Sequence, residues 1–190
     1  MIVIPFTHTD NINYELIITF PSPFSYISIV GGNPIGTLRI LPSITVYPQS
    51  FGINAPPYLA PVQEISANAF LGNQSITSIN ASNSILQIIH EGAFKDCHNI
   101  INVDLANSQA LNTLSHNCFF NDFNIKNVNL FGCTSLTTIE SSAFEACFNL
   151  TNINFNNCNS LTTLGDKAFL TTQNNPNRKL ESIDFKDCYL

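Results

Sequence analysis

The chain of 190 residues is long enough for one ordinary domain or for a short array of smaller units. Charged residues make up only 11% of it and hydrophobic residues 44%, so its polarity comes from neutral side chains, and its apolar content argues against disorder. With a net charge of −6 and no apolar run near the about 20 residues that cross a bilayer, we expect no nucleic-acid partner and no insertion into a membrane.

Residues 1–60 differ in composition from the rest of the chain. Nine of the ten prolines lie in the first 61 residues, whereas all six cysteines lie after residue 96. Short β-branched and aromatic runs at 13–20 and 25–30 are separated by Pro and Gly, which is typical of strands joined by turns. We therefore expect a β-rich, Pro-containing N-terminal cap over residues 1–60.

Residues 61–190 contain a repeat of about 25 residues. A phenylalanine recurs at intervals of 24 or 25 residues, with an aliphatic residue five positions before it and a small residue, Ala or Cys, directly before it. Apolar residues also follow it at fixed distances in each unit. The recurring phenylalanines are Phe70, Phe94, Phe119, Phe144 and Phe169. A fixed period of this length predicts five stacked repeats in a solenoid.

Each repeat contains one clear strand pattern. In LTNINF at 150–155 the alternation places Ile153 and Phe155 on one face, and Asn152 and Asn154 on the other. Stacking the repeats builds a parallel sheet, and the column of phenylalanines fills the space behind it. The segment SSAFEAC at 141–147 is too short for a long helix, so we expect one helical or 3₁₀ turn on the opposite side.

Two phrases in the repeat carry a family resemblance. LTNINFNNC at 150–158 matches the LxxLxLxxN/C pattern of leucine-rich repeats, and LTTIESSAFEAC at 136–147 resembles the BspA-like leucine-rich repeat family. The resemblance covers about residues 61–190, and residues 35–51 are interpreted as a divergent first repeat within the cap. It implies a leucine-rich-repeat solenoid, with a parallel sheet on one face and short turns opposite, and adhesion or host-surface binding for some members.

The cysteines fall into repeat positions. Cys133, Cys158 and Cys188 share the N/C position of the pattern, while Cys97 and Cys147 share another. We favour buried thiols over a disulfide between Cys133 and Cys158, because parallel side chains hold their Cβ atoms farther apart than a disulfide usually allows. Unpaired thiols and a start without a signal-peptide pattern favour an intracellular location, and the family resemblance leaves the cell surface open.

Residues with catalytic or metal-binding chemistry are few. His90 and His116 lie in neighbouring repeats, with Glu91 and Glu140 in the same layer of turns, but their spacing fixes no convergent metal geometry. No nucleophile elbow, phosphate-binding glycine loop or metalloprotease motif is present in the sequence. We therefore predict no metal, no cofactor and no enzyme.

The outward positions of the predicted sheet form polar rows. Amide side chains carry both donors and acceptors, so these rows suit a polar protein surface or glycan hydroxyls, and solubility combined with Asn ladders is the alternative interpretation. The candidate partner-binding residues are Asn102, Asp104, Lys126, Asn127, Asn129, Asn152, Asn154 and Asp184.

These patterns favour a non-enzymatic interaction module. It would bind a protein, or a glycan, through the polar sheet face, through the open C-terminal end after the fifth strand, or through both. The alternative is a structural subunit of a larger assembly. An ice-binding solenoid, using the threonine row of Thr113, Thr138 and Thr163, and an enzyme are less favoured hypotheses.

Overall fold

The structure is a computed structural model that describes residues 2–7, 12–18, 25–46, 57–170 and 182–184. In these ranges the chain forms strands and turns and no helix, so no helix that could span a membrane is found there. The strands are β1 (Ile2–Thr7), β2 (Ile12–Ile18), β3 (Ser25–Gly32), β4 (Gly36–Arg39), β5 (Ser43–Val46), β6 (Tyr58–Ile65), β7 (Ile76–Asn80), β8 (Ile88–Ile89), β9 (Asn102–Asp104), β10 (Thr113–Leu114), β11 (Asn127–Asn129), β12 (Thr138–Ile139), β13 (Asn152–Asn154), β14 (Thr163–Leu164) and β15 (Ser182–Asp184).

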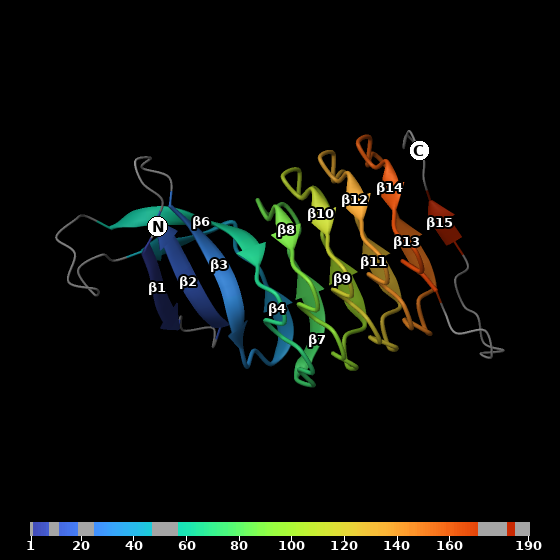
Figure 1. Cartoon of the computed structure of the whole chain (residues 1–190), viewed down its shortest axis with the longest axis horizontal. Helices are drawn as coiled ribbons and strands as arrows, with labels where there is room; N and C mark the ends of the chain where they lie inside the picture. The colour runs from blue at the N-terminus through green and yellow to red at the C-terminus, as the bar shows by residue number, and fades with distance from the viewer. Residues whose placement is uncertain (1, 8–11, 19–24, 47–56, 171–181, 185–190) are drawn as a thin grey trace.

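Two sheets run along the molecule and enclose its core (Figure 1). Sheet A has the order β1-β2-β3-β6-β8-β10-β12-β14, with β5 paired to β6, and sheet B has the order β15-β13-β11-β9-β7-β4. Strands of successive repeats pair in parallel, so that Leu114 lies opposite Ile139 in sheet A and Val128 lies opposite Ile153 in sheet B. The repeat is therefore a stacking interval, and the predicted leucine-rich-repeat solenoid is confirmed.

The N-terminal region continues both sheets with a different topology. β1, β2 and β3 pair antiparallel with one another, and β3 then pairs in parallel with β6. β4 pairs in parallel with β7 and forms one edge of sheet B. Residues 25–39 thus supply one strand to each sheet, and β1 and β2 extend sheet A alone.

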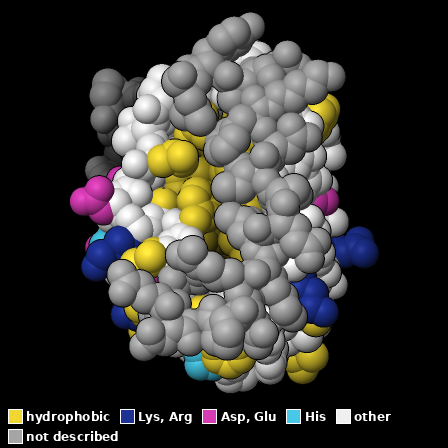
Figure 2. Space-filling view, turned by 90° about the vertical axis from the view of Figure 1, so that its right-hand side faces the viewer, with side chains coloured by type: hydrophobic (Ala, Val, Ile, Leu, Met, Phe, Trp, Pro, Cys, Tyr) yellow, Lys and Arg dark blue, Asp and Glu magenta, His cyan; other side chains and the backbone are white. Residues whose placement is uncertain are grey.

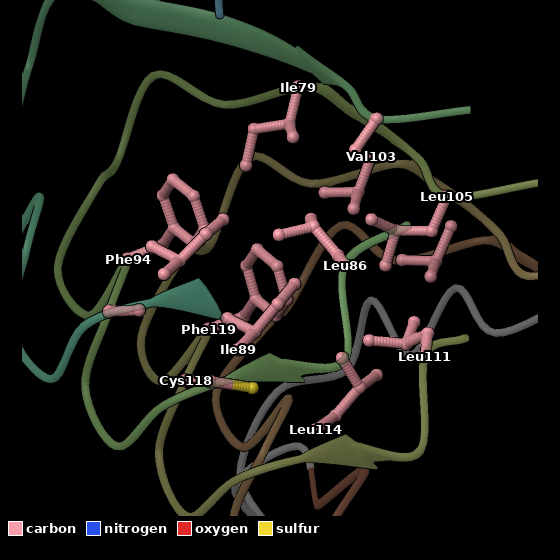
Figure 3. Packing of buried hydrophobic residues seen from close by; sticks show 14 of the residues in the cluster. Ile79, Leu86, Ile89, Phe94, Val103, Leu105, Leu111, Leu114, Cys118 and Phe119 are labelled. Atoms are coloured by element: carbon pink, nitrogen blue, oxygen red, sulfur yellow. The ribbon is translucent and has the colours of Figure 1, made fainter. Parts of the chain in front are cut away.

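The recurring phenylalanines form a continuous stack in the core. Phe94, Phe119 and Phe144 are at most 1% exposed. The ring centroids of Phe119 lie 5.2 Å from Phe94 and 5.0 Å from Phe144, with interplanar angles of 3° and 7°. Figure 3 shows the Phe94 and Phe119 rings parallel to each other, with aliphatic side chains from both sheets around them. Large buried side chains at fixed repeat positions thus hold the two sheets together.

The segments around the phenylalanines form turns that are not helical. The prediction of one helical or 3₁₀ turn in this segment is therefore wrong. Around Phe70 the amides of Ala69, Leu71 and Asn73 bond to carbonyls three residues earlier, which closes overlapping four-residue turns. The backbone φ is positive two residues before and two residues after the phenylalanine, and positive φ breaks a right-handed helix. Asn, Asp and Gly supply most of these positions, because they tolerate positive φ better than other residues. The residues are Asn68, Gly92, Asn117, Ser142 and Lys167 before the phenylalanine, and Gly72, Asp96, Asn121 and Ala146 after it.

Hydrogen bonds between repeats continue through these turns. In the turns around Phe70, Phe94, Phe119 and Phe144 the amides at the two positive-φ positions and at the phenylalanine donate to carbonyls of the next repeat, over 2.7 to 3.3 Å. The first chain of bonds runs Asn68 N to Glu91 O, Gly92 N to His116 O, Asn117 N to Ser141 O and Ser142 N to Asp166 O. Two parallel chains run through the phenylalanines and through the second positive-φ position. All of these N–H groups point toward the C-terminal end.

Sheet A in the repeats consists of two-residue strands, and the sequence analysis did not predict it. Strands as short as Thr113–Leu114 leave no room for an alternating pattern of apolar and polar residues. Each of these strands contains a buried leucine or isoleucine that fixes its position in the repeat. The strands form because this segment then pairs with the equivalent segment of the next repeat. The face opposite sheet B is therefore a second parallel sheet with turns beside it.

Candidate functional site

The outward face of sheet B carries the predicted asparagine row. Asn102, Asn127 and Asn152 are exposed and occupy equivalent positions on β9, β11 and β13. The Nδ2 of Asn127 donates to Oδ1 of Asn102 over 2.8 Å, and the Nδ2 of Asn152 donates to Oδ1 of Asn127 over 2.9 Å. The side chains thus form a ladder that holds each amide in a fixed orientation, with Asn127 at its centre.

A second polar row lies at the ends of the same strands and is half-buried. The Oδ1 atoms of Asp104, Asn129 and Asn154 each accept a hydrogen bond from the amide two residues ahead, over 3.0 to 3.2 Å. The Nδ2 of Asn129 also donates to Asp104 over 3.1 Å. These side chains therefore stabilise the bend after each strand, a local role typical of Asn and Asp that sequence spacing alone did not reveal.

The remaining predicted binding residues flank these rows. Lys126 is exposed directly before β11. Asp184 belongs to β15, where its backbone lies opposite Asn154. At the other edge of the sheet, Thr37 pairs with Ser78 and Arg39 with Asn80, so β4 adds a threonine and an exposed arginine to the two rows. The interpretation of residues 35–51 as a divergent first repeat did not place Thr37 and Arg39 on these rows.

Exposed apolar side chains border the polar rows. Ile101, next to the asparagine ladder, is 40% exposed, and Phe131, just beyond β11, is 38% exposed. At the β4 edge, Ile35 and Leu41 are 84% and 45% exposed and line a hollow of about 300 Å³ together with Arg39. The outward face of sheet B thus combines an ordered amide ladder with scattered apolar side chains.

The described cysteines are buried thiols. Sγ of Cys133 donates to Leu105 O and Sγ of Cys158 donates to Leu130 O, each over 3.1 Å, and neither forms a disulfide. Burial raises the pKa of Cys133 to about 12, and it raises the pKa of Cys97 as well. Since the thiolate is the nucleophile, these groups are unsuited to covalent catalysis. Cys188 lies outside the described residues.

Asp122 is a buried carboxyl that the sequence analysis did not single out. It stands three residues after Phe119, where the neighbouring repeats have Cys97 and Cys147. Its Oδ1 accepts a hydrogen bond from the amide of Cys97 over 2.6 Å, whereas its buried Oδ2 has no partner among the described residues. Burial raises the pKa of this carboxyl well above its usual value, and the charge of Asp96 raises it further. An acidic residue at a position that otherwise holds neutral ones was the signal that could have revealed it.

His90 and His116 do not converge on a common point. His90 lies 3.4 Å from the carboxylate of Glu64, whereas the His116 ring nitrogen Nδ1 lies 2.7 Å from Ser141 O. Glu140 accepts a hydrogen bond from the backbone amide of His116 over 2.8 Å. In the described ranges no three His, Cys, Asp or Glu side chains are arranged to hold a metal ion.

The C-terminal end of the solenoid shows apolar side chains. Figure 2 views this end and shows hydrophobic side chains gathered near its centre. Leu164 of β14, which is 41% exposed, differs here from its equivalents Leu114 and Ile139, which are fully buried.

Comparison with protein families matches residues 58–188 to the family described as the BspA type leucine rich repeat region, in six copies. This family is one of repeat modules that generally act as scaffolds for protein interaction, and it indicates no enzymatic activity. No curated protein matches the chain.

Solved structures with the same fold come from bacterial proteins. A leucine-rich repeat protein from Bacteroides ovatus matches with a TM-score of 0.61 and 22% identity over 85% of this chain and 38% of that one. The T. pallidum leucine-rich repeat protein matches with a TM-score of 0.60 and 20% identity over 86% of this chain and 65% of that one. The pneumococcal vaccine antigen PcpA matches with a TM-score of 0.59 and 16% identity over 87% of this chain and 47% of that one. The chain thus spans from 38% to 65% of the length of these proteins, and the likeness concerns the fold.

Proposed function

Since residues 58–188 make this chain a member of the BspA-type leucine-rich repeat family, we propose that it is a non-enzymatic interaction module that binds a protein through the outward face of sheet B. The observation that carries the proposal is the exposed ladder of Asn102, Asn127 and Asn152. Extended sheet faces of solenoids are common binding surfaces, because stacked repeats hold many side chains in one rigid array.

The ladder leaves hydrogen-bonding capacity for a partner. An asparagine amide has two N–H donors and an oxygen that accepts two bonds. Asn127 uses one donor toward Asn102 and one acceptor site toward Asn152, so one N–H and one lone pair remain directed to solvent. Because the ladder fixes these groups before binding, a partner that matches them loses little side-chain entropy in the complex.

The exposed apolar side chains favour a protein partner over a glycan. Ile101 and Phe131 border the ladder and offer apolar area that a protein surface can cover. The face carries few charged side chains, among them Arg39, Asp104 and Lys126, so it offers no concentrated charge for a highly ionic ligand.

A single substitution at the centre of the ladder tests the proposal. Asn127→Arg places a bulky charged side chain in the middle of the face, and Thr137→Arg makes a similar change at an exposed position beside sheet A. Wild-type and variant proteins are used as baits in extracts of the native source, and the bound proteins are quantified by mass spectrometry. We expect a partner that the wild type and Thr137→Arg retain and that Asn127→Arg loses at least tenfold.

Two results would contradict this assignment. If both variants recover the same partners equally, the outward face of sheet B is not part of the binding site. Binding to a glycan array with no retained protein would replace the protein partner with a carbohydrate one.

The second candidate is a structural subunit that docks through its C-terminal end. The partial exposure of Leu164 and the apolar centre in Figure 2 favour it. The same experiment distinguishes the two functions when Leu164→Arg is added as a third variant. Loss of the partner with Leu164→Arg alone would assign binding to the end of the solenoid.

A further inference from the structure

A polar hollow lies at the N-terminal edge of the turns, away from the outward face of sheet B. It has a volume of about 400 Å³, and its wall is mostly polar. Its lining comes from the loop after β3 and from the first turn of the repeats, namely Gly32, Asn33 and residues 69–75. Two segments that are distant in sequence therefore form one site.

The hollow exists because the N-terminal region lacks one turn. Between β6 and β7 the chain runs through residues 66–75, which form the overlapping turns around Phe70. The preceding pair of strands, β3 and β4, occupies equivalent places in the two sheets, but only residues 33–35 connect them. The space next to the first turn is therefore not filled by a turn from the preceding strand pair.

The first turn directs backbone carbonyls toward this space. In a trans peptide the C=O and N–H groups point in opposite directions. The amides of Asn68, Phe70 and Gly72 donate toward the C-terminal end, to Glu91 O, Ala93 O and Lys95 O. The carbonyls in the same peptide groups, those of residues 67, 69 and 71, therefore point toward the N-terminal end.

In later repeats every equivalent carbonyl accepts a hydrogen bond from the turn before it. Ala93 O, for example, accepts from Phe70, and Cys118 O accepts from Phe94. The carbonyl oxygens of Ala67, Ala69 and Leu71 accept no hydrogen bond from any residue that the structure describes. The loop that replaces the missing turn includes Pro34, which has no N–H to donate.

Gly31 lies close to one of these oxygens. A Cβ atom at this position would lie 2.7 Å from the Ala69 oxygen, closer than a carbon atom normally approaches. Any larger residue would therefore crowd the Ala69 carbonyl, and Ala69 itself lines the hollow.

The aligned peptide groups strengthen the negative potential at this edge. Each of the three hydrogen-bond chains joins five peptide groups head to tail, from the turn at Phe70 to the turn at Phe169. Aligned peptide dipoles in a helix produce about half an elementary charge at each end, and the same summation places a partial negative charge at the carbonyl end of these chains. The net charge of −6 on the chain acts in the same direction.

We propose that this hollow binds an organic cation with several N–H donors, a guanidinium or an alkylammonium group, through the carbonyl oxygens of Ala69 and Leu71. The cation supplies the hydrogen bonds that a preceding turn supplies elsewhere in the solenoid. Its charge matches the negative pole of the aligned peptide groups. An arginine guanidinium offers five N–H donors in a planar fork and the free cation offers six, which suits carbonyls repeated along one chain. Free organic cations and the arginine or lysine side chains of another protein both carry such a group.

The direct test is an NMR titration of the full chain with guanidinium chloride in the millimolar range, at constant ionic strength maintained with sodium chloride. The amides of Phe70 and Gly72 share their peptide groups with the two carbonyls and report on them. We expect saturable shifts for these amides and for Gly32, and none for Lys167 at the opposite end. A linear, unsaturated response throughout the chain would overturn the proposal.

Two variants at the rim of the hollow change the charge in opposite directions. Asn33 is exposed and lines the site. Asn33→Asp adds a carboxylate, and we expect guanidinium to bind about twofold to fivefold more tightly, as for an exposed ion pair. Asn33→Lys places an ammonium in the hollow, and we expect at least a tenfold loss. Gln109→Lys makes the same charge change at a distant exposed position and serves as the control.

Three further results decide the class and source of the cation. Saturable shifts with potassium chloride at the same concentrations would overturn the assignment to an organic cation. Tighter binding of the blocked peptide Ac-Gly-Arg-Gly-NH₂ than of guanidinium would identify a protein side chain as the source, and equal binding would identify the free cation. If neither Asn33 variant changes the affinity while both retain dispersed spectra, the cation binds elsewhere and the proposal is wrong.

Discussion

The column of phenylalanines inside the solenoid and the row of asparagines outside it share one spacing but depend on different forces. Phe119 lies between Phe94 and Phe144 with ring centroids 5.2 and 5.0 Å away, and it is fully buried. Asn127 lies between Asn102 and Asn152, joined by hydrogen bonds of 2.8 and 2.9 Å, and it is exposed. Both sets are ladders of identical side chains on stacked repeats.

The buried ladder contributes mainly to stability, whereas the exposed ladder is available for recognition. Burial of an aromatic ring contributes several kcal/mol, because the ring leaves water and fills the space between the sheets. An exposed amide exchanges a hydrogen bond with water for one with a neighbour, and its net contribution is small. The interior therefore fixes the fold, and the exterior can serve a partner at little cost to stability.

The largest expected effect comes from the centre of the aromatic column. Phe119→Ala removes a fully buried ring between two others, and we expect the free energy of unfolding to fall by about 3–5 kcal/mol. Urea unfolding followed by circular dichroism measures the change.

The adjacent residue provides the matched control. Phe120 is partly exposed, and its ring lies 5.2 Å from the Lys95 Nζ. Phe120→Ala should cost only about 0.5–1 kcal/mol, the range of an exposed cation–π contact. Equal losses for the two variants would show that the aromatic stack is not what holds the sheets together.

A smaller, pH-dependent effect is expected at Asp122, an acidic residue buried inside the solenoid. Because its folded-state pKa is raised, folding favours the protonated form, and this contribution declines as the pH rises from about 4, the unfolded value, through the folded pKa. Asp122→Asn keeps an oxygen for the Cys97 amide and removes the titration. We expect the variant to gain stability relative to the wild type by up to about 1.4 kcal/mol per pH unit across that window.

Urea unfolding of both proteins at pH 4 and pH 7 measures this difference. Asp166→Asn, at an exposed position, makes the same chemical change outside the core and serves as the comparison. A stability difference between wild type and Asp122→Asn that stays constant between the two pH values would mean that the buried carboxyl does not retain its proton.

The smallest effect is expected in the outer ladder. Asn127→Ala removes two exposed side-chain hydrogen bonds, and we expect the free energy of unfolding to change by about 0.5 kcal/mol or less. The same unfolding experiment applies, and Phe119→Ala sets the scale. A loss of 2 kcal/mol or more, on the order of a buried contact, would mean that the ladder is structural and would weaken its assignment to a partner.

The sequence predicted the features that depend on large or polar side chains at fixed intervals. The phenylalanine period revealed the stacking interval of the repeats in residues, and the alternation around Ile153 placed Asn152 on the outer face. The shared position of Cys133 and Cys158 predicted their buried thiols. In each case one residue type recurs because one physical environment recurs.

Features made by the backbone escaped prediction. In the repeats from β8 onward, sheet A consists of two-residue strands without a readable alternation, and the turns that were expected to be helical depend on positive φ at Asn68, Gly92 and their equivalents. The recurrence of Asn and Gly at these positions was a signal for positive φ that was present in the repeat. The polar hollow had no such signal, since main-chain carbonyls are common to all residues.

The one-way direction of the hydrogen bonds through the turns has a consequence for the length of the molecule. Every turn presents acceptors to the repeat before it and donors to the repeat after it, in the same arrangement from Phe94 to Phe144. Excision of a whole unit between these points would join donors to acceptors without mismatch, whereas loss of a few residues would leave groups unpaired. The solenoid can thus be shortened or lengthened in whole units while both of its ends keep their chemistry.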